Sequence, residues 1–187
     1  FKGQEDALRY ALCATAPESK DTDFTWSDFQ ARNNNELVAI FGNFINRVVV
    51  LTNKYWEGIV PKCNTLDAYD KQVLDKLKAF PDTISASIEK YRFREALGEL
   101  MNLARLGNKY LADTEPWRLK KTDEKRTETI MNISMQISAS LSVLSEPFMP
   151  FSSEKLKRLL NLNNMTWNDA GGIIINYNHK INPATHL

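Results

Sequence analysis

Glycine and proline are scarce in this sequence, with seven of each among 187 residues. Both residue types interrupt helices or mark turns, so their scarcity leaves long segments free to form regular structure. The prolines that are present fall where such segments end, as Pro17 and Pro61 do. No internal repeat or low-complexity tract is visible. The sequence therefore predicts a few long elements joined by short turns.

Cysteine and histidine are rarer still, with two of each. Cys13 and Cys63 lie far apart and in no metal-binding spacing, which excludes a disulfide framework or a zinc knuckle. His179 and His186 both fall in the C-terminal tail, so a catalytic triad or metal cluster cannot be built around them. A phosphate-binding glycine pattern is also missing. We therefore expect no catalytic residue, no metal and no cofactor in this chain.

Neither sign of charge dominates, since 24 basic residues face 23 acidic ones and the net charge is +1. A domain that binds nucleic acid through many phosphates carries a clear basic excess, so any RNA would be held by a few local contacts. No apolar run approaches the roughly 18 residues needed to cross a bilayer, and no signal peptide is visible. We expect a cytoplasmic chain without a membrane partner. Its start without methionine and its end without a polar tail suggest cuts in a longer chain.

Apolar residues at helical spacing are what the sequence has in abundance. The strongest pattern predicts one helix from about Asp28 to Trp56. Others are expected over residues 4–16, 93–111, 123–145 and 153–160, and from Leu66 onward with an interruption at Pro81. Gly171 to Ile175 fits a short strand or an extended tail. These elements predict an all-α fold, an antiparallel bundle of about five helices. The predicted core contains Leu37, Phe41, Phe44, Val48, Ile133, Ile137 and Leu141.

One candidate binding residue is Trp117, which follows Pro116 in a polar turn and precedes Arg118, Lys120 and Lys121. A tryptophan on a loop beside three cations suits stacking on a nucleobase, with the positive charge holding the backbone. The alternative is that Trp117 caps the core of the bundle. Composition alone leaves both interpretations open.

The polar edge of the long predicted helix is the second candidate. Asn43, Asn46 and Arg47 lie about one turn apart, beside the apolar stripe. Asparagine offers a donor and an acceptor and arginine a planar fork of donors, which suits the reading of base edges. A solvated face, or hydrogen bonds between helices, would explain the same residues.

Four stretches together carry a family resemblance. In chain order they are Asp6-Ala7-Leu8-Arg9-Tyr10; Asn34-Asn35-Glu36-Leu37-Val38 through Gly42-Asn43-Phe44-Ile45-Asn46-Arg47; Asn108-Lys109-Tyr110-Leu111 with Glu115-Pro116-Trp117; and Gly171-Gly172 with Ile181-Asn182-Pro183. They resemble methionyl-tRNA synthetases, the first lying just beyond the signature loop of the catalytic domain and the others in the anticodon-binding domain. The resemblance covers essentially the whole chain, and the Asn-x-x-x-Arg helix with the downstream Pro-Trp pair is its most specific part.

The resemblance implies the helical anticodon-binding domain of a class I synthetase. Residues 1–30 would be a connector from a missing catalytic domain, residues 31–165 the anticodon-binding bundle, and residues 166–187 a tail packing on that bundle. The parent would be an ATP-dependent methionine-tRNA ligase whose ATP, Mg²⁺ and zinc sites lie in the catalytic half, so this region alone would be inactive. The expected partners are that catalytic domain and the anticodon stem-loop of methionine tRNA, and not DNA.

Site roles follow from the same resemblance. Trp117 would stack on the CAU anticodon, Pro116 would shape its turn, and Asn43 and Arg47, with Asn46 beside them, would help read the cytosine. Ala39 stands where some members have a further asparagine, so a base contact at that position is not carried over. Two alternatives remain at this point. One is the matching domain of another class I synthetase, and the other is a helical protein-interaction module without RNA affinity.

Overall fold

The computed structural model of the chain describes residues 4–18 and 21–183. The other residues lie outside this description, and with them His186 and the outer ends of the predicted connector and tail. The described elements are α1 (Glu5–Ala14), α2 (Trp26–Arg32), the π-helix η1 (Asn33–Gly42), α3 (Asn43–Trp56), α4 (Ala68–Glu89), α5 (Phe93–Thr114), α6 (Pro116–Leu119), α7 (Glu124–Leu144), α8 (Pro150–Leu159) and the 3-10 turn η2 (Trp167–Asp169). These ranges contain no strand, only an isolated bridge between Ile59 and Lys180. The predicted all-α fold is confirmed.

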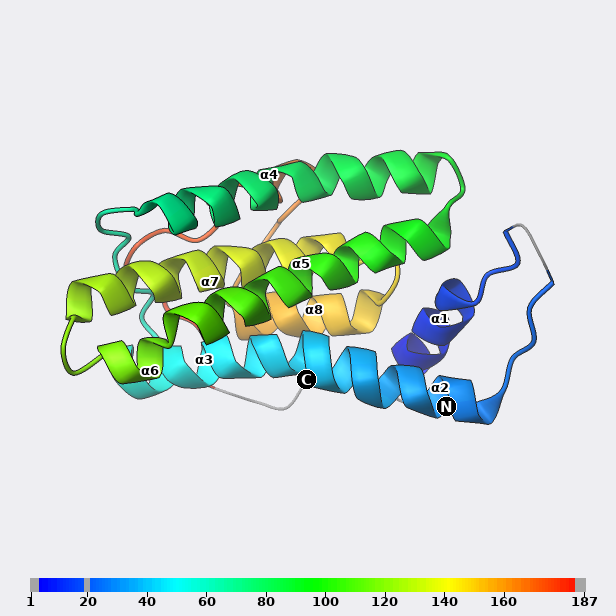
Figure 1. Cartoon of the computed structure of the whole chain (residues 1–187), viewed down its shortest axis with the longest axis horizontal. Coiled ribbons are helices and arrows are strands. Elements are labelled where there is room, and N and C mark those ends of the chain that lie inside the picture. The colour runs from blue at the N-terminus through cyan, green and yellow to red at the C-terminus, as the bar shows by residue number, and fades with distance from the viewer. Residues whose placement is uncertain (1–3, 19–20, 184–187) are drawn as a thin grey trace.

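Helix α7 forms the centre of the bundle. It packs against α3, α4, α5 and α8, and every residue from Thr129 to Ser145 is buried. Its serines are compatible with burial because their hydroxyls are hydrogen-bonded: Ser134, Ser138 and Ser142 donate to carbonyls of the preceding turn, and Ser140 accepts from the Gly171 amide. Figure 1 shows α4 along the upper edge of the bundle, α5 crossing in front of α7, and the long helix α2–η1–α3 along the lower edge.

The long helix runs without a break from Trp26 to Trp56, close to the predicted range. Its middle ten residues form the π-helix η1, which the side-chain pattern did not predict. Phe41, Phe44 and Val48 are buried as expected, whereas Leu37 is only partly buried. The reason is that i→i+5 hydrogen bonding takes more residues per turn, so a spacing of four no longer keeps Leu37 on the buried stripe. The predicted core residues of α7 are all buried: Ile133, Ile137 and Leu141.

The predicted interruption at Pro81 is wrong, because α4 continues through this residue. Proline has no backbone N–H and therefore leaves the Leu77 carbonyl without its helical donor. Gly171 of the C-terminal tail lies against this place: a Cβ added to it would be 3.0 Å from Pro81 Cγ and 3.2 Å from the Leu77 oxygen. Gly171 also has a φ of +81°, so only glycine fits here without strain. The tail therefore packs against the place where the helix lacks a hydrogen bond, while the Gly171 amide itself donates to Ser140 Oγ at 3.1 Å.

Residues 171–181 form an extended segment rather than a strand. The buried Gln136 of α7 anchors it, since its Nε2 donates to the Ile175 carbonyl at 2.7 Å and its Oε1 accepts from the Ile174 and Ile175 amides at 2.8 and 3.0 Å. Ile175 and Ile181 are buried. The tail therefore contributes to the core as well as covering it.

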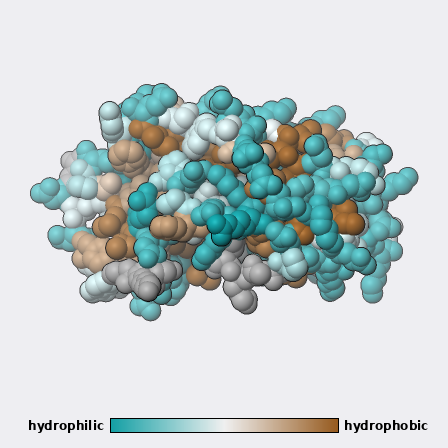
Figure 2. Space-filling model, turned by 180° about the vertical axis from the view of Figure 1, so that it is seen from behind, coloured by the Kyte–Doolittle hydropathy of each residue, from teal (hydrophilic) through white to brown (hydrophobic). Residues whose placement is uncertain are grey.

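The surface mixes hydrophilic and hydrophobic side chains. Seen from behind, hydrophilic residues cover most of the face, and hydrophobic ones form several separate patches among them (Figure 2). A search of the described helices for a membrane-spanning segment, by length and hydropathy, finds no candidate.

Candidate nucleic-acid interface

The turn that carries Trp117 is more ordered than the sequence predicts. Glu115 ends α5 in the left-handed conformation, with φ +42°, and Pro116 occupies the first position of α6, where its fixed φ suits a helix start. Pro116 is buried, and Trp117 is partly buried against the core. Trp117 is therefore not an exposed loop residue but part of a single helical turn. Figure 1 shows α6 beside the C-terminal half of α3 at one end of the bundle.

Trp117 and Arg47 meet across this junction. The guanidinium carbon of Arg47, on α3, lies 4.8 Å from the centroid of the Trp117 ring, which is a cation–π distance. These two residues are far apart in the sequence and were selected for separate reasons. The structure brings them together.

Asn43 lies one turn before Arg47 and is held by α5. Its Nδ2 donates to Asn108 Oδ1 at 3.3 Å, while Asn108 Nδ2 donates to the carbonyls of Ile40 at 2.9 Å and Ala104 at 3.1 Å. Asn108 thus ties the end of the π-helix to α5 and orients Asn43. The exposed Asn43 keeps its Oδ1 without a hydrogen bond to any described residue, so this acceptor is available to a ligand.

Asn46 is placed differently from the other candidates. It is exposed and forms no hydrogen bond within the described part of the chain. Together with Asn43 it lines a groove of about 520 Å³ between α1, the long helix and α8. Asn43 therefore borders both this groove and the helix junction with α5, whereas no contact joins Asn46 to Trp117.

Gly107 fixes how closely α5 approaches the long helix. A Cβ at this position would lie only 2.4 Å from Cζ of the buried Phe44, so any larger residue would collide with the ring. Phe44 and Gly107 are the neighbours in sequence of Asn43 and Asn108. The close packing of Phe44 against Gly107 therefore sets the distance between Asn43 and Asn108, which share a hydrogen bond. The sequence analysis missed this role.

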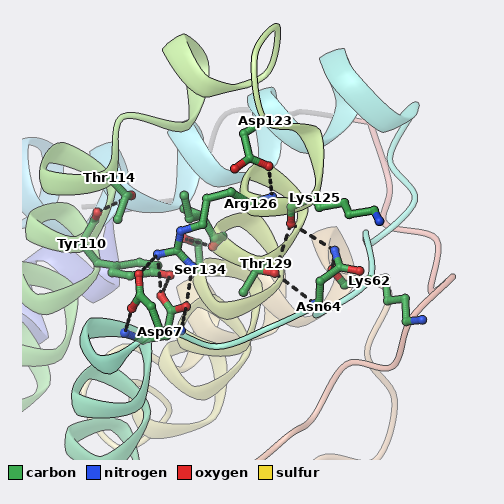
Figure 3. Close-up of polar contacts among 12 residues, drawn as sticks. Lys62, Asn64, Asp67, Tyr110, Thr114, Asp123, Lys125, Arg126, Thr129 and Ser134 are labelled. Atoms are coloured by element: carbon green, nitrogen blue, oxygen red, sulfur yellow. Dashed lines mark hydrogen bonds and ion pairs between the residues drawn. The ribbon is translucent and has the colours of Figure 1, made fainter.

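A second polar cluster, which the sequence pattern did not predict, joins α5 to the N-terminal ends of α4 and α7. The fully buried Asp70 accepts hydrogen bonds from the Tyr110 hydroxyl at 2.6 Å, from both terminal nitrogens of Arg126, and from the Asp67 amide at 3.0 Å. Figure 3 shows Tyr110, Arg126 and Asp67 converging from three different helix ends. The only signal in the sequence was the three-residue spacing of Asp67 and Asp70, which here form a capping box.

The pKa values in this cluster follow from its burial and its charges. Burial by itself would raise the pKa of Asp70, but the hydrogen bonds from Arg126, Tyr110 and the backbone outweigh it and hold the pKa below its ordinary value. The hydrogen bond to Asp70 raises the pKa of Arg126, and burial raises that of Tyr110. The cluster is therefore an ionised pair with a neutral phenol at neutral pH.

Metal-binding chemistry finds no support in the described residues. They contain no group of three or more His, Cys, Asp or Glu side chains that could hold a metal ion. The two cysteines are free. The candidate residues instead offer hydrogen bonding, from the side-chain amides of Asn43 and Asn46 and from the guanidinium of Arg47, which lies beside the ring of Trp117.

Solved structures share the fold of this chain. The structure aligns with the unliganded methionyl-tRNA synthetase of Mycobacterium tuberculosis with a TM-score of 0.91, over 97% of this chain and 38% of that one, at 22% identity. The same enzyme bound to methionyl-adenylate aligns with a TM-score of 0.89. At this identity the likeness establishes the fold alone, an all-α bundle like the one in that enzyme.

Sequence comparisons make the assignment more specific. The model of the anticodon-binding domain of methionyl-tRNA ligase matches residues 60–179, and that of the class I tRNA synthetases for methionine matches residues 2–49. The methionine-tRNA ligases of Cytophaga hutchinsonii and Christiangramia forsetii are 62% and 67% identical, over 92% and 86% of this chain. The chain belongs to the family of methionyl-tRNA ligase anticodon-binding domains. It spans about a quarter of the length of these relatives, 25% and 23%. The alternative of another class I synthetase is thereby set aside.

Proposed function

We propose that this chain reads the CAU anticodon of methionine tRNA, as part of a ligase whose remaining portion attaches methionine to that tRNA with ATP. The observation that carries the proposal is the contact between Arg47 and Trp117 at 4.8 Å. It places an aromatic ring and a fork of donors next to each other at one exposed end of the bundle. Recognition of unpaired loop bases needs this combination of stacking and edge hydrogen bonds.

Each candidate residue has a distinct role in this proposal. Trp117 stacks on an anticodon base, and Pro116 fixes the turn that presents the ring. Arg47 and Asn43 donate to and accept from the edge of the cytosine, for which Asn43 keeps a free Oδ1. Asn46 extends the amide surface into the neighbouring groove.

In the unbound chain the Arg47 guanidinium lies over the indole. A base that stacks on this face displaces the guanidinium toward the edge of the base, where its donors are used for reading. A cation–π contact at a partly exposed site is worth only about 0.5–1 kcal/mol, whereas a stacked base contributes about 1–3 kcal/mol. The exchange is therefore favourable.

The chemistry of the ligase would belong to the rest of the polypeptide. ATP with Mg²⁺, methionine and a zinc ion would be bound there, and that part would also be the chain's protein partner. We expect the chain alone to support no methionine-dependent exchange of pyrophosphate into ATP. Such exchange by the purified chain would contradict this division of roles.

Binding of anticodon stem-loops tests the proposal. The wild-type chain should bind a CAU stem-loop more tightly than one with uracil at the first anticodon position. Asn43→Ala and Arg47→Ala should lose this preference, because hydrogen bonds to base edges carry the identity. Asn163→Ala, an exposed asparagine in the turn after α8, is the matched control and should keep the preference. Equal binding of both stem-loops by the wild-type chain would refute the proposal.

A further inference from the structure

Two lysines flank an aromatic ring two helical turns beyond Arg47. The ammonium groups of Lys54 and Lys120 lie 5.5 and 5.9 Å from the centroid of the Tyr55 ring. Lys120 also lies 4.4 Å from the ring of Trp56. We call Lys54, Tyr55 and Lys120 the lysine–tyrosine clamp. It joins the end of α3 to the end of α6.

The charges of this clamp are only partly compensated. Lys120 pairs with Glu124, but Lys54 has no carboxylate within ion-pair distance among the described residues. The same holds for the adjacent Lys121. Figure 3 shows two further lysines at this end, Lys62 and Lys125, whose side chains point away from the bundle. Neither Lys62 nor Lys125 forms an ion pair with a described residue, so several lysines at this end are free to meet an anion.

The hydroxyl of Tyr55 adds a donor to the same place. It forms no hydrogen bond with any described residue. Both ammonium groups lie within 6 Å of the centre of one ring, and ammonium groups and a phenolic hydroxyl are all donors to the acceptor oxygens of an anion. They carry no planar pattern of donors and acceptors that would distinguish one base from another.

The position of the clamp identifies the anion. Tyr55 follows Arg47 by two turns of α3, about 12 Å along the helix axis, and Lys120 is the residue directly after α6, which carries Trp117. If a base of an RNA strand stacks on Trp117, the strand continues on one side of that base, either 5′ or 3′, past Lys54, Tyr55 and Lys120. The groups of that strand that lysines bind are its phosphodiesters.

We propose that the lysine–tyrosine clamp binds the backbone phosphate next to the nucleotide stacked on Trp117. The inference rests on the proposed function, because it needs the strand to be held by Trp117. The clamp supplies affinity and register without sequence information, whereas Asn43 and Arg47 supply the identity of the base. Since the clamp neutralises only one or two phosphates, it agrees with a nearly neutral domain.

The test combines a protein variant with RNA that lacks one charge. Lys54→Gln removes the unpaired cation from an exposed helical position, and Lys90→Gln, at the far end of α4, is the matched control. We expect Lys54→Gln to weaken binding of the CAU stem-loop about three- to fivefold and to reduce the slope of log K against log salt by about 0.7. Its preference for CAU over UAU should not change. On stem-loops with a neutral methylphosphonate at the contacted position, Lys54→Gln should cause no further loss.

The possible results separate the two proposals. Equal affinities and salt slopes for Lys54→Gln and Lys90→Gln would overturn the clamp, as would a Lys54→Gln effect that persists on every methylphosphonate stem-loop. Binding of inorganic phosphate alone that depends on Lys54, with an unchanged RNA salt slope, would also overturn it. A wild-type chain without any preference for CAU would instead contradict the proposed function. Melting temperatures of both variants within a degree or two of wild type would show that neither result comes from unfolding.

Discussion

Two arginines in this bundle each meet a partner from a distant helix, and the contacts they form are opposite in kind. Arg126 is held by the fully buried Asp70 through two hydrogen bonds, and by Asp67 at 2.9 Å. Arg47 only lies over the ring of Trp117, and the neighbouring Asn43 is held by one long hydrogen bond of 3.3 Å. In the first contact the guanidinium donors and the carboxylate acceptors are hydrogen-bonded to each other. In the second, the donors of Arg47 and the acceptor oxygen of Asn43 have no hydrogen-bond partner among the described residues.

This difference separates a structural role from a binding role. Breaking a buried, bidentate ion pair leaves an uncompensated charge, so the Asp70–Arg126 contact is suited to hold helix ends in place. The contact between Arg47 and Trp117 is weak enough for a base to replace it. The α5 helix links the two regions, since it carries Tyr110 in one and Asn108 in the other. The rigid cluster thus supports a surface whose own contacts can be exchanged.

Asp70→Ala should cause the largest change. We expect a loss of about 3 kcal/mol in the free energy of unfolding, the low end of the range for a broken buried pair because Asp67 remains beside Arg126. Urea unfolding measures it. Asp75→Ala is the control, because this exposed carboxylate of α4 pairs with Lys78 at the surface and its loss should cost at most about 1 kcal/mol. Similar losses in both variants would remove the distinction between the two regions.

Trp117→Ala should weaken binding of the CAU stem-loop roughly tenfold to a hundredfold, since a stacked base contributes about 1–3 kcal/mol. Because the ring is partly buried against the core, stability should also fall, but by less than the roughly 3–5 kcal/mol of a fully buried tryptophan. Affinity and melting temperature are measured on the same preparation. Trp26→Ala, in which a highly exposed indole (64%) is removed, should leave affinity unchanged. Unchanged affinity with a large drop in melting temperature for Trp117→Ala would show that Trp117 is a packing residue.

Arg47→Ala should act on selectivity more than on stability. The preference for cytosine at the first anticodon position should fall about tenfold, the value of a hydrogen bond to a charged donor. Stability should change by no more than about 1 kcal/mol, because only a cation–π contact is lost. Competition between CAU and UAU stem-loops measures the first quantity and thermal melting the second. A loss of stability as large as that of Asp70→Ala would show that Arg47 stabilises the fold in the way that Arg126 does.

The pH dependence of stability should distinguish the regions by a smaller effect. The folded-state pKa of Asp70 lies below the unfolded-state value of about 3.9. Ionised Asp70 therefore stabilises the fold at neutral pH, and this contribution declines as the pH falls below about 4 toward the folded-state pKa. Between pH 5 and 3 the wild-type chain should lose more stability than Asp70→Asn. Arg47→Ala should follow the wild-type curve, and parallel curves for wild type and Asp70→Asn would contradict the argument.

Side-chain periodicity was sufficient to predict the helices, because burial of one face is a local property of the sequence. It predicted the long helix within two residues of its start, and it predicted α5 and α7. It did not predict that Asn33–Gly42 form a π-helix, since a change in hydrogen-bond partner leaves the order of polar and apolar residues unaltered. It also predicted a break at Pro81, whereas α4 continues through this residue, and the tail that packs against it at Gly171 comes from a distant segment.

The candidate site was predictable in its residues but not in its geometry. Trp117, Pro116, Asn43 and Arg47 were selected from residue type and resemblance, and their roles in RNA binding stay predictions. That Arg47 lies over Trp117, that Asn108 orients Asn43, and that Gly107 admits Phe44 all depend on how α3, α5 and α6 pack. Trp117 was expected in a polar turn after Pro116, whereas here Pro116 starts the short helix α6.

The contact between Gly171 and Pro81 has a consequence for the order in which the chain matures during synthesis. Helix α4 leaves the ribosome long before residue 171 does, and domains fold as their segments emerge. Until the tail arrives, the Leu77 carbonyl and the side chain of Gln136 lack the neighbours that they have in the finished structure. The helices can assemble first, but the bundle closes only when residues 171–181 have been made. A nascent chain stalled before that segment should therefore remain more sensitive to protease than the released one.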